Sequence, residues 1–269
     1  MLVNGNEQAA ISPADRGFNY GDGVFRTMTM DHRRVRNWPR HYRKLFGDCE
    51  RLGIVCPPAE VFEADLARIA ATDMACVVKI IVTRGVGGRG YAAFEQAEPT
   101  RVVLSSALPA YAPEYLTAGI VARLCTLRLA RQPQLAGIKH LNRLEQVMAR
   151  NEWSNPAIAE GLLLDQAGNV ICGTMSNVFV IRDRGLHTPD LSGCGIAGVT
   201  RDRIMTAAVR LNLNVKIMQL TPGELLAADE VLLCNSVIGV WQVRELEQKR
   251  WEKGYFTPLI RTSLEKDDD

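Results

Sequence analysis

The chain has 269 residues, of which 47% are hydrophobic, so it is long enough to bury a large core and to form two modest domains. Lysine and arginine total 32 against 30 acidic residues, which gives a formal net charge of only +2. No long basic run of the kind that binds nucleic acid is present, and we therefore exclude a nucleic-acid partner.

The seven cysteines are scattered, without Cys-x-x-Cys spacing or nearby histidine pairs. This pattern predicts neither a disulfide framework nor a zinc site, and we expect no bound metal. The N-terminus has no basic region followed by an apolar one, and no apolar run approaches the length of a membrane span. We therefore expect a cytoplasmic protein that does not bind a membrane.

The first motif along the chain is the glycine-rich segment 12–25, which leads into a predicted strand from Val24 to Met30. Gly21 and Gly23 allow backbone angles that are closed to other residues and let the chain pass close to other groups. Taken alone, Gly-Asp-Gly predicts an ordinary turn.

The next elements complete the first half. The pattern predicts a helix from His41 to Leu52, ended by Gly53, and a second helix from Ala59 to Ala71. Two strands follow, over 76–83 and 101–106, with the segment 84–91 after the first of them. Its Gly-x-Gly-Gly-x-Gly spacing does not indicate a dinucleotide site, because no helix pattern follows it, so a hairpin loop is the plain alternative.

The domain organisation follows from a segment rich in proline and tyrosine, 108–115. Such a composition is typical of a linker, and a new strand is predicted from Gly119 to Thr126. We therefore predict an N-terminal α/β domain over residues 1–110, a linker over 111–119 and a C-terminal α/β domain over 120–269. Tyr111 either faces a cleft or packs within the linker.

Lys139 is the most informative single residue. Apolar residues recur at helical spacing at Leu141, Leu144, Val147 and Met148, which predicts a helix with one buried face and places Lys139 at its entrance. The helix dipole and a partly dry environment there would disfavour the ammonium form and give an amine able to form a Schiff base. The alternative is a solvated lysine ahead of an ordinary amphipathic helix.

The second half continues with a predicted hairpin over 161–172, whose returning strand is expected to run on to Ile181. A helix is predicted from Asp202 to Leu211, after a glycine-containing turn. Free amides at its N-terminus predict a phosphate-binding site, with Val199 and Thr200 as contacts. The alternative is that this sequence is only a helix cap.

Four sequence words together resemble one enzyme family. The segment Gly-Ile-Lys-His-Leu-Asn-Arg-Leu-Glu-Gln at 137–146 is similar to the lysine segment of 4-amino-4-deoxychorismate lyases, and the motif at 84–91 also resembles these lyases. The motifs at 15–25 and 198–201 resemble those of fold-type IV pyridoxal phosphate enzymes in general. These lyases belong to the fold-type IV pyridoxal phosphate enzymes, with branched-chain and D-amino-acid aminotransferases. The resemblance implies a two-domain α/β (α+β) fold of the D-amino-acid aminotransferase type, a homodimer and the cofactor pyridoxal 5'-phosphate.

The resemblance also implies an activity and roles for particular residues. The activity is conversion of 4-amino-4-deoxychorismate to 4-aminobenzoate and pyruvate, in folate biosynthesis. Lys139 holds the cofactor and transfers the proton, and Thr27 faces the substrate, either as proton donor to the leaving group or as the residue that orients it. Further contacts to the cofactor are implied for Lys44, Cys172, Thr174, Ser176, Val199, Thr200 and Ser236, and contacts to substrate for Arg84, Arg89, Tyr91 and Tyr111. Arg84, Arg89 and Tyr91 suit a substrate with two carboxylates.

Two positions depart from the family pattern. Lys44 stands where the family has a phosphate-binding arginine, and a lysine lacks the planar fork that binds two oxygens. Cys172 stands where the family has a glutamate that pairs with the pyridine nitrogen, and a thiol is a weak partner. Strand alternation would place Thr174 and Ser176 on the same side as Cys172. A class-IV aminotransferase and a cofactor-poor, non-catalytic relative remain the alternative functions.

Overall fold

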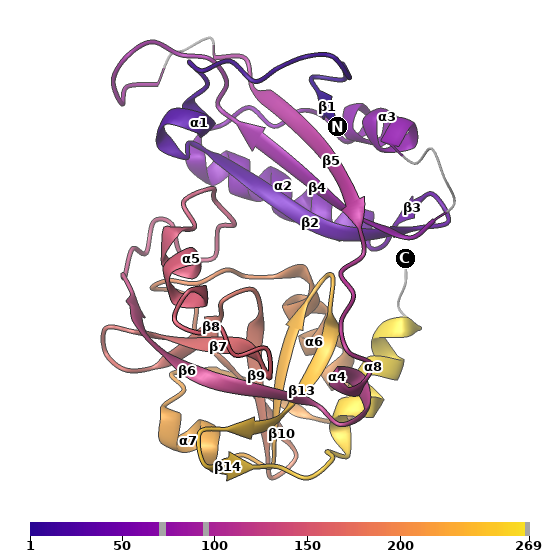
Figure 1. Cartoon of the computed structure of the whole chain (residues 1–269), viewed down its shortest axis with the longest axis vertical. Coiled ribbons are helices and arrows are strands. Elements are labelled where there is room, and N and C mark those ends of the chain that lie inside the picture. The colour runs from indigo at the N-terminus through magenta and orange to yellow at the C-terminus, as the bar shows by residue number, and fades with distance from the viewer. Residues whose placement is uncertain (70–73, 94–96, 267–269) are drawn as a thin grey trace. The chain divides into compact units, whose positions relative to one another are not determined.

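The structure, a computed structural model, describes residues 1–69, 74–93 and 97–266 and divides into two units (Figure 1). The first unit contains residues 1–109 together with 139–142. The second contains 110–138 and the described chain from 143 onward. None of the helices in the described residues combines the length and the apolar character needed to cross a lipid bilayer.

The first unit is built on an antiparallel sheet of five strands in the order β1-β5-β4-β2-β3. Buried residues alternate along the long strand β2, so that Val24, Met28 and Met30 face the core. Helices α2 and α3 cover that face of the sheet (Figure 1). The strands are β1 (Leu2–Val3), β2 (Gly23–Asp31), β3 (Arg34–Val35), β4 (Cys76–Thr83) and β5 (Thr100–Ala107), and the helices are α1 (Arg16–Tyr20), α2 (Trp38–Leu52) and α3 (Ala59–Ile69).

Helix α2 starts three residues before the predicted start at His41. Pro39 in its first turn is compatible with this, because the first N–H groups of a helix have no partner within the helix. The helix ends where predicted, at Gly53, whose φ of 64° is the left-handed conformation that glycine adopts without strain. The predicted end of the second helix, Ala71, lies outside the described residues.

The second unit is a sheet in the order β11-β10-β9-β12-β13-β6-β7-β8, with β14 paired to β13. A further pairing of β8 with β9 closes six of these strands into a barrel, while β10 and β11 extend the sheet beyond β9. Its elements are α4 (Glu114–Thr117), β6 (Ile120–Leu129), α5 (Leu144–Arg150), β7 (Ile158–Asp165), β8 (Val170–Gly173), β9 (Asn177–Arg182), β10 (Gly185–Pro189), α6 (Val199–Arg210), β11 (Asn214–Met218), α7 (Pro222–Leu226), β12 (Glu230–Asn235), β13 (Gly239–Leu246), β14 (Lys249–Arg250) and α8 (Phe256–Glu265).

Several apolar clusters hold the second unit together. One contains Trp241, which is 2% exposed, among aliphatic residues of the barrel strands. Another packs Ile204 and Ala208 of α6 against Ile260 of α8. Burial of large apolar side chains of this kind contributes about 1.5–3 kcal/mol each.

The division differs from the predicted domains at two places. Residues 111–119 belong to the second unit rather than to a separate linker, because they form α4 and because the rings of Tyr111 and Tyr115 pack edge-on against Trp241. Lys139 belongs to the first unit rather than to the C-terminal one, because its main chain is hydrogen-bonded to strand β2.

Candidate active site

The side chain of Lys139 lies against strand β2 of the first unit. Its Nζ is 4.4 Å from the centroid of the Phe25 ring, and the Nζ of Lys79 is 4.7 Å from the same centroid. Thr27 is directly opposite Lys79 in the register of β2 and β4 and shares the half-buried face of β2 with Phe25. The structure therefore brings Lys139, Thr27 and Lys79 to one face of the sheet, the face opposite α2.

The main chain of Lys139 is fixed to the same strand. The Phe25 N–H donates to the Lys139 carbonyl at 2.9 Å, and the Leu141 N–H donates to the Gly23 carbonyl at 2.9 Å. A Cβ at Gly23 would lie 2.6 Å from the Val82 carbonyl oxygen and 2.8 Å from the Leu141 side chain. Glycine is therefore required at position 23 for the lysine segment to approach β2 so closely.

A buried carboxylate completes this anchoring. The Lys139 N–H donates to Asp48 Oδ2 at 2.9 Å, and the same carboxylate oxygen accepts a short hydrogen bond from Arg26. The side chains of Arg26 and Asp48 are only 3% and 8% exposed. Arg26 also donates to the Lys44 carbonyl at 2.9 Å. Burial raises the pKa of Asp48, and the charge of Arg26 opposes that rise.

This ion pair was not predicted from the sequence, although a signal for it exists. Arg26 occupies a core-facing position in the alternation of β2. Asp48 lies on the buried face of α2, three residues after the buried Leu45. A charge at each of two apolar positions indicates that the two side chains pair, because an isolated buried charge is strongly unfavourable.

The predicted position of Lys139 at the start of a helix is wrong. Helix α5 begins at Leu144, five residues later, and the effect of a helix dipole falls off within the first turn. The face expected to be buried is not, since Leu144, Val147 and Met148 are 75%, 51% and 61% exposed. The chain from 139 to 142 is held instead by its bonds to β2.

The substrate residues expected in the segment 84–91 differ in their surroundings. Arg84 donates to both oxygens of Asp22 and to the carbonyls of Leu52 and Gly53, so four of its hydrogen bonds join parts of the first unit. These bonds give Arg84 a structural role, and its contact to substrate stays a prediction. Arg89 and Tyr91 are exposed.

In the second unit, two of the expected phosphate contacts come together. The hydroxyls of Thr200, in the first turn of α6, and Ser236, after β12, are 3.2 Å apart. The turn before α6 is fixed by Asn177, whose Oδ1 accepts from the Gly198 N–H and whose Nδ2 donates to the Ile196 carbonyl. Together with the free amides of the helix start, these hydroxyls form a site suited to an anion.

Val199 and Gly137 define the surroundings of this anion site. Val199 is the first residue of α6 and is 4% exposed. Gly137, only two residues before Lys139, pairs with the turn that leads into α6, because its N–H donates to the Gly195 carbonyl and its carbonyl accepts from Ala197 N–H. Within the second unit, Gly137 thus fixes the turn before α6.

The hydroxyls of Thr174 and Ser176 are not arranged as expected. Strand β8 ends at Gly173 and the chain turns before β9, so strand alternation does not extend from Cys172 to Ser176. Both hydroxyls donate to the carboxylate of Glu160, which is 1% exposed. The backbone N–H groups of residues 161, 174 and 175 donate to it as well. The two hydroxyl protons are therefore bound to Glu160, a residue that sequence reasoning missed.

Cys172 is buried in β8 and is 7% exposed. Burial raises the pKa of its thiol far above the usual range, the nearby Cys194 and Glu160 act in the same direction, and Arg143 acts against them. The thiol is consequently neutral at physiological pH. Unlike the glutamate expected at this position, it carries no charge.

Tyr111 packs against the barrel, with its ring edge-on to Trp241 at 4.8 Å between centroids. Its ring is partly exposed, and burial together with the charge of Glu160 raises the pKa of its phenol. The structure thus shows Tyr111 packed on the barrel, and its contact to substrate stays a prediction.

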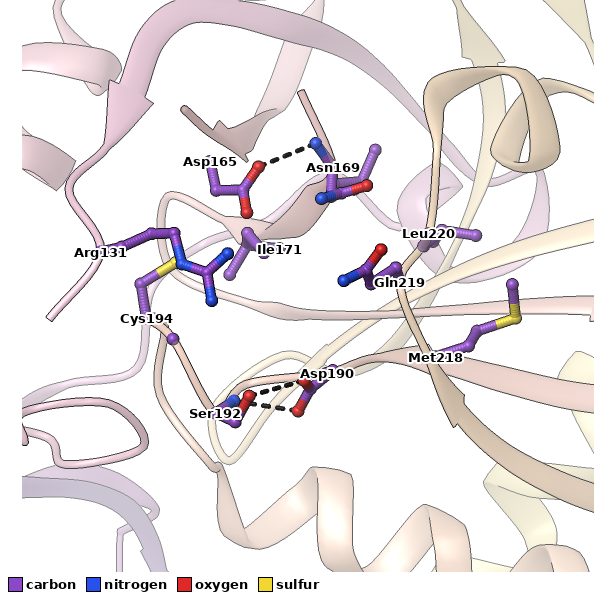
Figure 2. Close-up of a pocket in the computed structure, with 12 residues that line it drawn as sticks. Arg131, Asp165, Asn169, Ile171, Asp190, Ser192, Cys194, Met218, Gln219 and Leu220 are labelled. Carbon is purple, nitrogen blue, oxygen red and sulfur yellow. Dashed lines mark hydrogen bonds between the residues drawn. The ribbon is translucent and has the colours of Figure 1, made fainter. Parts of the chain in front are cut away.

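A small cavity also lies in the second unit (Figure 2). Its volume of about 20 Å³ is enough for roughly one water molecule. Asp190 accepts two hydrogen bonds from Ser192 at its rim, and Asp165 accepts one from the Asn169 N–H. None of the expected site residues lines it, and it is too small for a cofactor.

The chain is similar to known enzymes over almost its whole length. The model of the family described as amino-transferase class IV matches residues 23–246. An aminodeoxychorismate lyase of Vibrio harveyi is 33% identical over 238 residues, 88% of each chain. A putative branched-chain-amino-acid aminotransferase of Methanocaldococcus jannaschii is 28% identical, over 90% of this chain and 84% of the other.

A solved structure is also similar to the chain in three dimensions. The crystal structure of 4-amino-4-deoxychorismate lyase from Pseudomonas aeruginosa superposes with a TM-score of 0.94 and 41% sequence identity, covering 99% of this chain and 98% of that one. The expected mixed α/β fold of the fold-type IV enzymes is confirmed. The chain therefore belongs to the amino-transferase class IV family.

Proposed function

We propose that this chain is a lyase that uses pyridoxal 5'-phosphate to convert 4-amino-4-deoxychorismate to 4-aminobenzoate and pyruvate, a step of folate biosynthesis. The observation that carries the proposal is the placement of Lys139, whose main chain is fixed by Asp48 and β2 and whose amine lies on the face that bears Thr27. The 41% identity to a structure named as this lyase supports the choice of substrate.

The residues present fit the cofactor at two of its three recognition points. The amine of Lys139 in the first unit would bind its aldehyde carbon, and in the second unit the Thr200 and Ser236 hydroxyls at the start of α6 suit its phosphate. At the third point, the ring nitrogen, Cys172 offers a neutral thiol in place of a carboxylate. When bound, pyridoxal phosphate supplies an aldehyde for the substrate amine and a ring that withdraws electrons from the adjacent carbon.

The residues of the chain then have separate tasks. Lys139 accepts the proton from the substrate carbon that bears nitrogen. The Thr27 hydroxyl, on the same face of β2, donates to the ether oxygen as the pyruvate unit leaves. Lys79 and Arg89 supply positive charge for the substrate carboxylates. Loss of the proton and of the ether group leaves an aromatic ring, which makes the elimination downhill.

The second candidate is a class-IV aminotransferase, since relatives named as branched-chain and D-alanine aminotransferases are 28% and 26% identical. The neutral thiol of Cys172 favours the lyase. An aminotransferase must return a proton to the cofactor and so depends more strongly on a charged partner at the ring nitrogen. The elimination is assisted by aromatisation and tolerates a weaker partner.

The test is the formation of 4-aminobenzoate, followed by its fluorescence, when purified protein and added pyridoxal phosphate meet 4-amino-4-deoxychorismate. Lys139→Ala should abolish both the product and the visible absorbance of lysine-bound cofactor. Lys216→Ala, which removes an exposed lysine from β11, should change neither. Amino transfer from amino acids without any 4-aminobenzoate would favour the aminotransferase. Weak cofactor binding without turnover would favour a non-catalytic relative.

We also infer a homodimer in the cytoplasm. The exposed apolar side chains of Leu144, Val147 and Met148 on α5 support a contact with a second copy, because such groups are usually covered in the assembly. The seven free cysteines are typical of a reducing compartment. Sedimentation analysis of the protein and of Val147→Glu tests the dimer, which the variant should weaken.

A further inference from the structure

Two cysteines of the first unit lie side by side at the end of helix α2. Cys49 is in the last turn of the helix, Cys56 is in the segment that follows Gly53, and their thiols share a hydrogen bond. We propose that Cys49 and Cys56 are an oxidation site, at which a hydroperoxide converts the two thiols to a reversible disulfide. This inference goes beyond the proposed lyase activity and does not depend on it.

The backbone explains why the two residues meet. Gly53 reverses the chain, and the Ile54 N–H donates to the Cys49 carbonyl at 2.9 Å, so the helix ends in a Schellman motif. The returning segment then runs back along α2, since the Tyr42 hydroxyl donates to the Pro57 carbonyl at 3.2 Å. Cys56 lies between these two contacts and faces the turn of the helix that carries Cys49.

The two thiols are not equivalent. Cys49 is fully buried, whereas Cys56 is partly exposed. The hydrogen bond from the Cys49 thiol lowers the pKa of Cys56, and the same bond together with burial raises the pKa of Cys49. Since the thiolate is the reactive form, Cys56 is the residue that meets an oxidant and Cys49 is the one that resolves the product.

The chemistry balances with a hydroperoxide as the oxidant. The Cys56 sulfur attacks the peroxide, so that an S–O bond forms, the O–O bond breaks and an alcohol or water leaves. The Cys49 sulfur then attacks the sulfenic acid, so that the S–S bond forms and the S–O bond breaks. The Cys49 proton leaves with the second water. In total, two thiols lose two electrons and two protons to one hydroperoxide.

Closing the disulfide requires the two sulfurs to approach to bonding distance. The segment after Gly53 is packed less tightly than α2, because Val55 is 68% exposed while Leu45 and Cys49 of α2 are fully buried, so we expect this segment to make the adjustment. Asp48 precedes Cys49 on the packed helix and anchors the Lys139 N–H. We therefore expect oxidation to leave Asp48 and the lysine segment in place, so that the oxidised protein keeps its activity.

Peptide mapping of the full chain tests the proposal. Trypsin cleaves after Arg51, between the two cysteines, and gives the peptides 45–51 and 52–68. After treatment with one equivalent of hydrogen peroxide and alkylation of the remaining thiols, we expect these two peptides to be joined, and to separate again on reduction. Both peptides alkylated, or Cys56 oxidised to sulfinic acid with Cys49 still alkylated, would overturn the proposal.

Variants identify the order of events. In Cys49→Ala, dimedone should trap the sulfenic acid on Cys56, because the resolving thiol is gone. In Cys56→Ser, Cys49 should remain alkylatable after denaturation, because it is buried from the oxidant. Cys76→Ser is the matched control, since Cys76 is also partly exposed, and it should form the crosslink as the parent does. Equal trapping of sulfenic acid in the parent and in Cys49→Ala would show that Cys49 does not resolve it.

Discussion

The carboxylate of Asp48 has two roles in the first unit: its ion pair with Arg26 stabilises the fold, and its hydrogen bond holds the main chain of Lys139. Replacing Asp48 allows the two roles to be measured separately. Asp48→Asn leaves the guanidinium of Arg26, 3% exposed, without its counter-charge. Breaking a buried ion pair in this way costs about 3–5 kcal/mol, so we expect the free energy of unfolding to fall by that amount. The variant keeps one oxygen that can accept the Lys139 N–H.

A set of double variants distinguishes the two roles. Arg26→Met together with Asp48→Asn leaves no unpaired charge, and replacing both partners is often nearly neutral, so we expect a loss of only about 1 kcal/mol. Arg26→Met with Asp48→Leu should be similarly stable but offers no acceptor to the Lys139 N–H. Misplacing a catalytic group by about 1 Å costs around 100-fold, so this variant should lose up to about 100-fold in kcat.

Urea unfolding measures the stabilities, and 4-aminobenzoate formation measures kcat. If Asp48→Asn lowers the free energy of unfolding by less than about 1 kcal/mol, Arg26 and Asp48 do not form the buried ion pair described above. If the Met and Leu double variant keeps the kcat of the parent protein, the bond from Asp48 to Lys139 does not position the amine. Either result would refute this reasoning about the first unit.

Three further predictions concern charge and the cofactor. Burial raises the pKa of Asp22, but hydrogen bonds and charges from Arg84 and Arg16 outweigh it and the pKa is lowered. The contribution of this carboxylate to the free energy of unfolding is thus present above pH 3.8 and is lost as the pH falls through the folded-state pKa of Asp22. In Asp22→Asn, the free energy of unfolding measured in urea should therefore depend less on pH in the acid range. Cys172→Glu should raise the ratio of amino transfer to 4-aminobenzoate formation, measured on the same preparation. Thr200→Val should raise the dissociation constant of pyridoxal phosphate about tenfold, the equivalent of one hydrogen bond of about 1.4 kcal/mol, in equilibrium titrations.

Elements with a local signal were predicted well from the sequence. The strand predicted over 76–83 coincides with β4, because apolar and β-branched residues follow one another between breakers. The end of α2 was predicted correctly because Gly53 is a local signal that needs no tertiary context. The family and the mixed α/β fold were predicted from the lysine segment, and both are confirmed.

Interactions between distant segments could not be predicted in the same way. The turn after Gly173 invalidates the alternation argument for Thr174 and Ser176, and the partner of both is Glu160, on the neighbouring strand. A strand that continued from Cys172 would have left the Glu160 carboxylate without these hydroxyl donors. Because a buried carboxylate needs its hydrogen bonds, the buried glutamate in an apolar strand was the signal for this turn.

The same lesson applies to Lys139, where the sequence argument relied on a helix that begins too late. In the structure, Lys139 is distinguished by the contacts that hold it in place and not by a helix dipole. Its amide is bound by Asp48, its carbonyl and the next residues are paired with β2, and its amine lies over Phe25. Within the first unit, the pairing of Lys139 and Leu141 with β2 holds the main chain on both sides of the lysine side chain. This pairing explains why the family pattern includes the residues next to Lys139 as well as the lysine itself.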